Sequence, residues 1–156
     1  MSFHIVFVEP EIPPNTGNIA RTCAATNTPL HLVRPLGFNI DDKSVRRAGL
    51  DYWKYVNLHV YDSLDDFLSK CGDHRLILAT TKGINRYDEI TYRDDDMFVF
   101  GRETKGLPME FINSRKEMTV RIPMSENTKL RSLNLSNSAN LILFEALRQS
   151  GFPQLV

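Results

Sequence analysis

The sequence is poor in cysteine, in long apolar stretches and in net charge. Its two cysteines, Cys23 and Cys71, lie far apart and in no metal-ligand spacing, so neither a disulfide framework nor a zinc site is supported. No apolar run approaches the roughly 20 residues that cross a bilayer, and the N-terminus lacks the pattern of a secretory signal. These absences predict a cytoplasmic protein with no membrane partner and no bound metal.

The charges balance, with 19 basic and 19 acidic residues. A net charge of zero excludes a protein that coats nucleic acid through bulk charge, so any nucleic-acid contact requires a local basic patch. One such cluster, Lys43, Arg46 and Arg47, is either an ordinary solvated surface or a phosphate contact. The length of 156 residues predicts a single domain over residues 1–156.

Several catalytic signatures are also missing. The sequence has no G-x-G-x-x-G dinucleotide fingerprint, and neither Ser132 nor Ser136 stands in the G-x-S-x-G pattern of serine hydrolases. The histidines are scattered along the chain without metal or triad spacing, and we assign no catalytic role to His4, His31, His59 and His74.

The remaining pattern is that of an α/β protein. Strand-like runs rich in Val, Ile, Leu and aromatic residues cover residues 3–8, 30–34, 56–61, 76–81, 97–100 and 118–122. Helical stretches cover residues 15–26, 63–70, a short segment after Pro108, and 136–149. Several strand runs are almost wholly apolar, which is typical of strands buried on both faces. We therefore expect an α/β fold with a mostly parallel sheet covered by helices.

The densest polar region lies immediately before the last apolar helix, in residues 131–140 (RSLNLSNSAN). Five small hydroxyl or amide side chains occupy the seven positions 132–138. One such side chain is enough to cap a helix by accepting a hydrogen bond from a free backbone N–H. The surplus favours a ligand site.

A second polar segment opens the first helix, in residues 15–21 (NTGNIAR). Asn15, Asn18 and Arg21 are spaced by three, so we expect them to form one polar ridge. Helix N-termini attract anions, and arginine can grip a phosphate through two hydrogen bonds. The pattern fits RNA phosphate or ribose binding, and it equally fits an ordinary capped helix with one surface arginine.

A third segment, residues 100–108 (FGRETKGLP), joins a buried strand to a loop bounded by Gly101 and Gly106. The glycine spacing superficially resembles a P-loop, but Leu107 and Pro108 stand where that motif needs Lys followed by Ser or Thr. The segment is therefore either a tight β-to-α turn or a loop where an adenine-type ligand approaches the glycine backbone.

The last helix is more apolar than one core contact requires. It carries a core-facing stripe at helical spacing, made of Ala139, Ile142, Leu143, Ala146 and Leu147. Leu141 and Phe144 extend beyond this stripe and need a second cover. We favour a second subunit in a two-fold homodimer over a loop of the same chain.

Together, the three polar segments resemble those of the SpoU-type branch of the SPOUT methyltransferases, which are knotted RNA ribose 2′-O-methyltransferases. The matching motifs are residues 15–21, 100–108 and 122–138, and the resemblance runs over nearly the whole chain. It is closest to the minimal bacterial members, which methylate the wobble nucleotide, a cytidine or a carboxymethylaminomethyl-type uridine, of leucine tRNA.

This resemblance implies an α/β-knot, with a deep C-terminal trefoil knot. It implies an obligate homodimer whose active site borrows residues from the partner, and S-adenosyl-L-methionine as cofactor with S-adenosyl-L-homocysteine as product. The cofactor-binding residues that it implies are Ala79, Thr80, Gly101, Glu103, Ile122, Ser132 and Leu133.

The resemblance also implies catalytic roles for Arg21, near the target ribose, and for Asn15 and Asn134, which organise the site. Ser136 is then left to start the last helix. Because arginine is almost never deprotonated in proteins, Arg21 suits a phosphate or ribose clamp better than a general base. Two alternatives stay open: methylation of another RNA such as rRNA, and a non-catalytic knotted module that only binds RNA.

Overall fold

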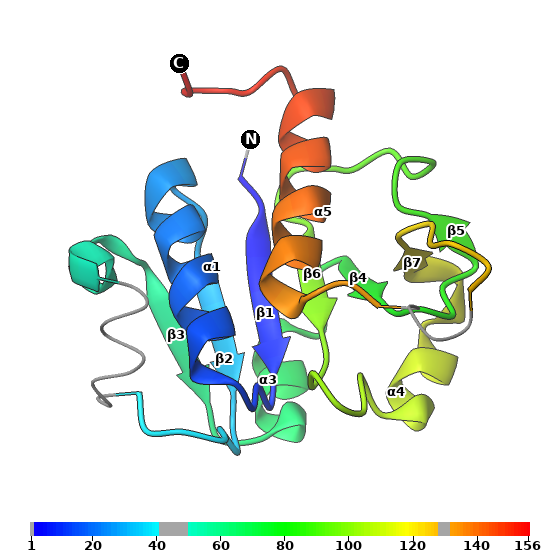
Figure 1. The fold of residues 1–156 in the computed structure, drawn as a ribbon, viewed down its shortest axis with the longest axis horizontal. Coiled ribbons are helices and arrows are strands. Elements are labelled where there is room, and N and C mark those ends of the chain that lie inside the picture. The colour runs from blue at the N-terminus through cyan, green and yellow to red at the C-terminus, as the bar shows by residue number, and fades with distance from the viewer. Residues whose placement is uncertain (1, 41–49, 128–131) are drawn as a thin grey trace.

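The computed structural model describes residues 2–40, 50–127 and 132–156 (Figure 1). The basic cluster of Lys43, Arg46 and Arg47 lies outside the described residues, as does Arg131.

The centre of the fold is a seven-stranded sheet with the order β3-β2-β1-β6-β4-β7-β5 (Figure 1). All pairings among the described strands are parallel. The strands are β1 (His4–Val8), β2 (Leu30–Val33), β3 (Leu58–Tyr61), β4 (Leu76–Ala79), β5 (Asn85–Arg86), β6 (Met97–Phe100) and β7 (Thr119–Arg121). Only β5 was not predicted, because its two residues carry no apolar pattern. The predicted α/β class with a parallel sheet is confirmed.

The helices also follow the predicted segments. They are α1 (Pro13–Thr26), α3 (Leu64–Cys71), α4 (Met109–Ser114) and α5 (Leu135–Gln149), with short 3-10 helices η1 (Leu50–Tyr55) and η2 (Lys116–Met118). Helix α1 begins two residues earlier than predicted, because prolines suit the first turn, where a missing N–H costs no hydrogen bond. The Ser63 hydroxyl accepts a hydrogen bond from the Asp66 N–H and caps α3. None of the helices in the described ranges is long and apolar enough to cross a membrane.

Side chains alternate between the two faces of the sheet. Helices α1 and α5 cover one face of the sheet, and α3 lies on the other (Figure 1). Ile5 and Phe7 of β1 pack with residues of α1 and α5, whereas Val6 and Val8 pack with residues of α3 and α4. All four are fully buried, and each burial of this size contributes about 1.5–3 kcal/mol. Burial on both faces explains why the strands read as continuous apolar runs.

The chain extends the sheet in two directions from its centre. From β1 it moves to β2 and the edge strand β3, then crosses to the other side, where β4, β5, β6 and β7 lie. Strands β1 and β6 therefore meet at the point where the order reverses, and the loops leaving their carboxyl ends diverge. In parallel α/β sheets, ligands bind in the crevice at such a point.

The four histidines meet on the α3 side of the sheet, although the sequence separates them. His4, His31 and His59 come from the neighbouring strands β1, β2 and β3, and the rings of His31 and His59 stack at 4.7 Å. The ring of His74 lies 6.1 Å from that of His4. Within the described ranges, no group of three or more His, Cys, Asp or Glu side chains is arranged to hold a metal ion.

Candidate functional site

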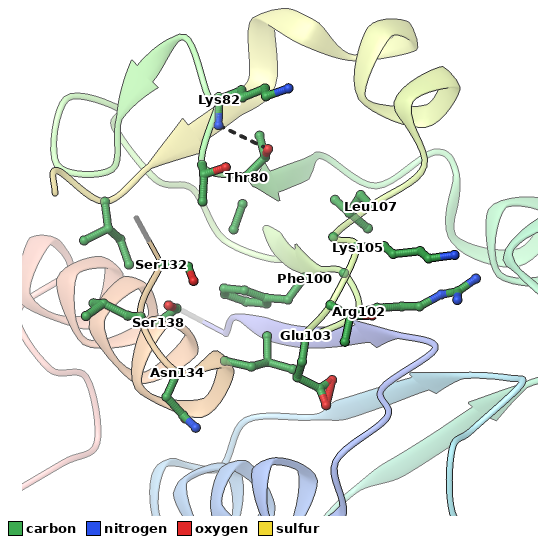
Figure 2. Close-up of a pocket in the computed structure, with 18 of the residues that line it drawn as sticks. Thr80, Lys82, Phe100, Arg102, Glu103, Lys105, Leu107, Ser132, Asn134 and Ser138 are labelled. Atoms are coloured by element: carbon green, nitrogen blue, oxygen red, sulfur yellow. Dashed lines mark hydrogen bonds between the residues drawn. The ribbon is translucent and has the colours of Figure 1, made fainter. Parts of the chain in front are cut away.

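A cavity of about 640 Å³ opens at the carboxyl end of the sheet. Its walls come from the segments that follow β1, β4, β6 and β7 and from the start of α5 (Figure 2). Figure 2 shows Ser132 and Ser138 on the α5 side of the cavity and Leu107 opposite them. The cavity is lined by nine of the ten predicted site residues, namely Asn15, Ala79, Thr80, Gly101, Glu103, Ile122, Ser132, Leu133 and Asn134.

The loop after β6 folds back on itself, and this explains Gly101. The Gly106 N–H donates to the Arg102 carbonyl at 2.8 Å, and Gly106 has a left-handed backbone with φ of 67°. A Cβ atom on Gly101 would lie only 2.1 Å from the Gly106 carbonyl carbon. Gly101 is therefore required by the close approach of the loop's own backbone, which agrees with the tight-turn interpretation of this segment.

Two carboxylates tie the loops after β1 and β6 together at the centre of the sheet. The Glu103 carboxylate accepts hydrogen bonds from the N–H groups of Glu11, at 3.0 and 3.1 Å, and of Ile12, at 2.5 Å. In return, Glu11 Oε1 accepts from the Thr104 hydroxyl at 2.7 Å and from its N–H at 3.2 Å. These bonds from Thr104 lower the pKa of the Glu11 carboxyl. Glu103 thus fixes the rim of the cavity.

The sequence alone does not predict that Glu11 joins these two loops. The signal that could have identified it is positional, since Glu11 follows the first strand and Thr104 follows the fifth predicted strand. Segments that leave neighbouring parallel strands emerge at the same edge of the sheet. Strand order is not visible in the sequence, so the pairing of these two loops could not be inferred.

Asn134 joins the start of α5 to α1. Its side-chain oxygen accepts from the Ser136 and Asn137 N–H groups at 3.0 and 3.3 Å, so Asn134 caps the helix. Its amide nitrogen donates to Asn15 Oδ1 at 2.8 Å. The expectation that Ser136 starts the helix is wrong. An amide has a donor and an acceptor on one end, so Asn134 caps the helix and also holds the buried Asn15.

Arg21 stands apart from the other predicted residues. It does not line the cavity of its own chain, and its guanidinium lies over the ring of Tyr52, 5.1 Å from the centroid. The expected polar ridge divides, because Asn15 is buried against Asn134 while Asn18 and Arg21 are exposed. The structure therefore gathers the predicted site around one cavity and leaves Arg21 on the outer surface of α1.

Basic side chains border the cavity. Lys82, Arg102 and Lys105 all line it, and Figure 2 shows Arg102 and Lys105 extending in the same direction from the loop after β6. Arg102 Nη2 lies 3.7 Å from Glu9 Oε1. On a chain with no net charge, Arg102 and Lys105 form a local basic pair of the kind that a phosphate contact requires.

The comparisons with known proteins identify the family of the chain. Residues 2–144 match the model of the SpoU rRNA Methylase family. The chain belongs to this family. A relative from Methylovorus glucosotrophus (strain SIP3-4), named tRNA (cytidine(34)-2'-O)-methyltransferase, is 50% identical over 155 residues, which cover 99% of each chain.

Two solved structures share the fold of this chain. A structure described as giving insights into the 2-OH methylation of C/U34 on tRNA has a TM-score of 0.90 and 40% identity, with 97% of both chains covered. The SpoU methyltransferase AviRb from Streptomyces viridochromogenes, in complex with the cofactor AdoMet, has a TM-score of 0.82 and 22% identity, with 97% of this chain and 61% of that chain covered. This last likeness extends to the fold alone.

Proposed function

We propose that the chain transfers a methyl group from S-adenosyl-L-methionine to the ribose 2′-hydroxyl of the wobble nucleotide, a cytidine or a modified uridine, in the anticodon loop of leucine tRNA. The observation that carries the proposal is the meeting of nine predicted positions around one cavity in a member of the SpoU methylase family. The relative named for cytidine 34 of tRNA supports the choice of substrate. An anticodon loop is single-stranded and exposes its bases to a small enzyme.

The cavity fits a ligand of the cofactor's size and chemistry. Binding sites for small molecules commonly enclose about 300–1,000 Å³ and combine apolar walls with a few polar groups. Here Leu107, Ile122 and Ile142 supply apolar surface, and Thr80 and Ser132 supply hydroxyl groups. The residues that would hold the cofactor are Ala79, Thr80, Gly101, Glu103, Ile122, Ser132 and Leu133. When bound, S-adenosyl-L-methionine supplies a methyl group already activated on a positively charged sulfur.

The protein's own task is then to orient the ribose and assist removal of the hydroxyl proton. Asn15 and Asn134 hold each other at the edge of the cavity and keep α1 and α5 in register. Glu103, whose carboxylate is engaged by two backbone N–H groups, positions the cavity wall. Arg21 clamps the ribose or its phosphate. That phosphate can accept the proton of the 2′-hydroxyl.

The position of Arg21 supports a homodimer. Because Arg21 does not line its own chain's cavity, a second subunit is needed to bring this side chain to a cofactor. Helix α5 offers the surface for such a contact, since Leu141 and Phe144 are 40% and 44% exposed. A two-fold dimer would bury these side chains and place the partner subunit's Arg21 at each site.

Membership of the SpoU family also supports a C-terminal trefoil knot in one catalytic domain over residues 1–156. The strand order fits such a path, since β7 is inserted between β4 and β5 before the chain returns to form α5. With tRNA as substrate, the place of action is the cytoplasm.

The deciding experiment is transfer of a tritium-labelled methyl group from S-adenosyl-L-methionine to tRNA from a strain that lacks this protein. We expect label on the ribose of nucleotide 34 in leucine tRNAs. Label in rRNA but not in tRNA would assign the enzyme to another RNA. Binding of tRNA without any transfer would support the non-catalytic alternative instead.

A further inference from the structure

Tyr55 is the most exposed large aromatic side chain in the described ranges, at 67%. Single exposed apolar residues are common on protein surfaces, so exposure alone assigns no role. The location of Tyr55 does indicate a role. It is the last residue of η1, the 3-10 helix that packs against α1.

Helix η1 places Tyr55 on the surface that carries Arg21. Tyr52 lies three residues before Tyr55, and residues three apart in a 3-10 helix stand on the same side, about 6 Å apart along the axis. The Tyr52 ring lies under the Arg21 guanidinium. Tyr55 therefore lies one helical turn beyond Tyr52, the residue that contacts Arg21. An extended ligand that contacts Arg21 could therefore continue along η1 toward Tyr55.

A cation accompanies the exposed ring. Lys54 Nζ lies 5.1 Å from the centroid of the Tyr55 ring. An aromatic ring beside a basic side chain is the recurring arrangement for single-stranded nucleic acid, where the ring stacks on a base and the cation approaches the backbone. Lysine is depleted from the cores of protein interfaces, so the pair suits RNA better than a second copy of this chain.

We propose that Tyr55 stacks on an unpaired base next to the methylated nucleotide, while Lys54 approaches a neighbouring phosphate. This inference rests on the proposed function, because it needs tRNA as the substrate and Arg21 as the ribose clamp. Tyr55 is then a positioning residue for the RNA. It has no part in binding the cofactor.

The test is the kinetics of methyl transfer with Tyr55→Ala, Tyr55→Leu and Tyr55→Phe variants of the full chain. Stacking requires a ring, so Tyr55→Ala and Tyr55→Leu should each raise KM for tRNA about tenfold or more with little change in kcat. The matched variant Tyr55→Phe keeps the ring and should retain KM within about twofold. Affinity for S-adenosyl-L-methionine should stay the same in all three variants.

A second measurement follows the base itself. An anticodon stem-loop carrying 2-aminopurine beside nucleotide 34 should lose fluorescence on binding the wild-type protein or Tyr55→Phe, and keep it with Tyr55→Ala. Unchanged KM and quenching in Tyr55→Ala would overturn this inference while leaving the proposed function intact. Conversion of Tyr55→Ala to a monomer in sedimentation would overturn it by placing Tyr55 at a subunit contact. A wild-type protein that transfers no methyl group to tRNA would instead remove the proposed function.

Discussion

At the carboxyl end of the sheet, polar side chains surround an open cavity, whereas on the α3 face near the amino end they close on one another. Thr80, Ser132 and Lys82 border a volume of about 640 Å³. His31, by contrast, has a partner for each ring nitrogen: Nε2 lies 3.0 Å from His4 Nδ1, and Nδ1 lies 2.8 Å from the Tyr61 hydroxyl. Polar groups that satisfy each other stabilise the fold, while polar groups around a cavity can bind a ligand.

The closed cluster also has a defined direction of hydrogen bonding. With neutral rings, the Tyr61 hydroxyl donates to His31, His31 donates to His4, and His4 donates to Asp95 at 3.4 Å. A proton added to His31 would remove the acceptor that Tyr61 uses. Burial acts in the same direction and lowers the pKa of His31 to about 3. The four histidines gather in space, and burial keeps His31 neutral.

The largest expected effect is loss of methyl transfer in Arg21→Ala. If the partner's Arg21 clamps the ribose at the cavity, its removal should reduce kcat/KM by about a hundredfold or more, because orientation of the nucleophile is lost. Affinity for S-adenosyl-L-methionine, measured by calorimetry, should not change. Weaker cofactor binding with normal turnover at saturation would contradict the role of Arg21.

The matched control for Arg21→Ala is Arg93→Ala. Arg93 is an exposed arginine in the segment before β6, at the opposite end of the sheet from the cavity. Its removal changes the net charge by the same amount but should leave kcat/KM within about twofold, as expected for a surface cation far from a phosphate. An equal loss in both variants would mean that overall charge, and not the site, governs binding of the RNA.

The next prediction compares the loss of stability when each of two helix-capping side chains is removed. Asn134→Ala removes the cap of α5 and the donor to the buried Asn15, so unfolding should become easier by about 2–4 kcal/mol, with a fall in methyl transfer. Ser63→Ala removes only the cap of α3, far from the cavity, and should cost about 1 kcal/mol with normal activity. Urea denaturation and initial rates measure both. Equal losses of stability would show that the link between Asn134 and Asn15 contributes nothing.

These comparisons also explain what the sequence could predict. Strands such as β1 and β6 could be predicted, because each is a short apolar run in the sequence. Most residues that line the cavity could be predicted only from the resemblance of the chain to a known family. The choice between Asn134 and Ser136 as the helix cap was missed, because both residue types cap helices well and the deciding contact, with Asn15, is remote in sequence.

The position of Arg21 and the histidine cluster depend on tertiary structure in the same way. Arg21 turns toward Tyr52, in a helix that the sequence pattern did not indicate. His4, His31 and His59 become neighbours only because β1, β2 and β3 are adjacent and parallel. Helical spacing and strand alternation describe single elements, so neither property could reveal contacts between elements.

A pH series tests the closed end of the sheet. Because the pKa of His31 is about 3 in the folded chain and 6.5 without burial, the unfolded chain binds a proton first as the pH falls. The stability that neutral His31 contributes is complete above about pH 6.5 and declines between pH 6.5 and 3, by on the order of 1 kcal/mol per pH unit. Urea denaturation from pH 7.5 to 4.5 should show this slope, and His31→Leu should reduce the slope.

The control is His59→Gln, which removes an exposed histidine of the same cluster and should keep most of the slope. An imidazole signal of His31 that titrates near pH 6.5 in the folded protein would contradict the closed arrangement.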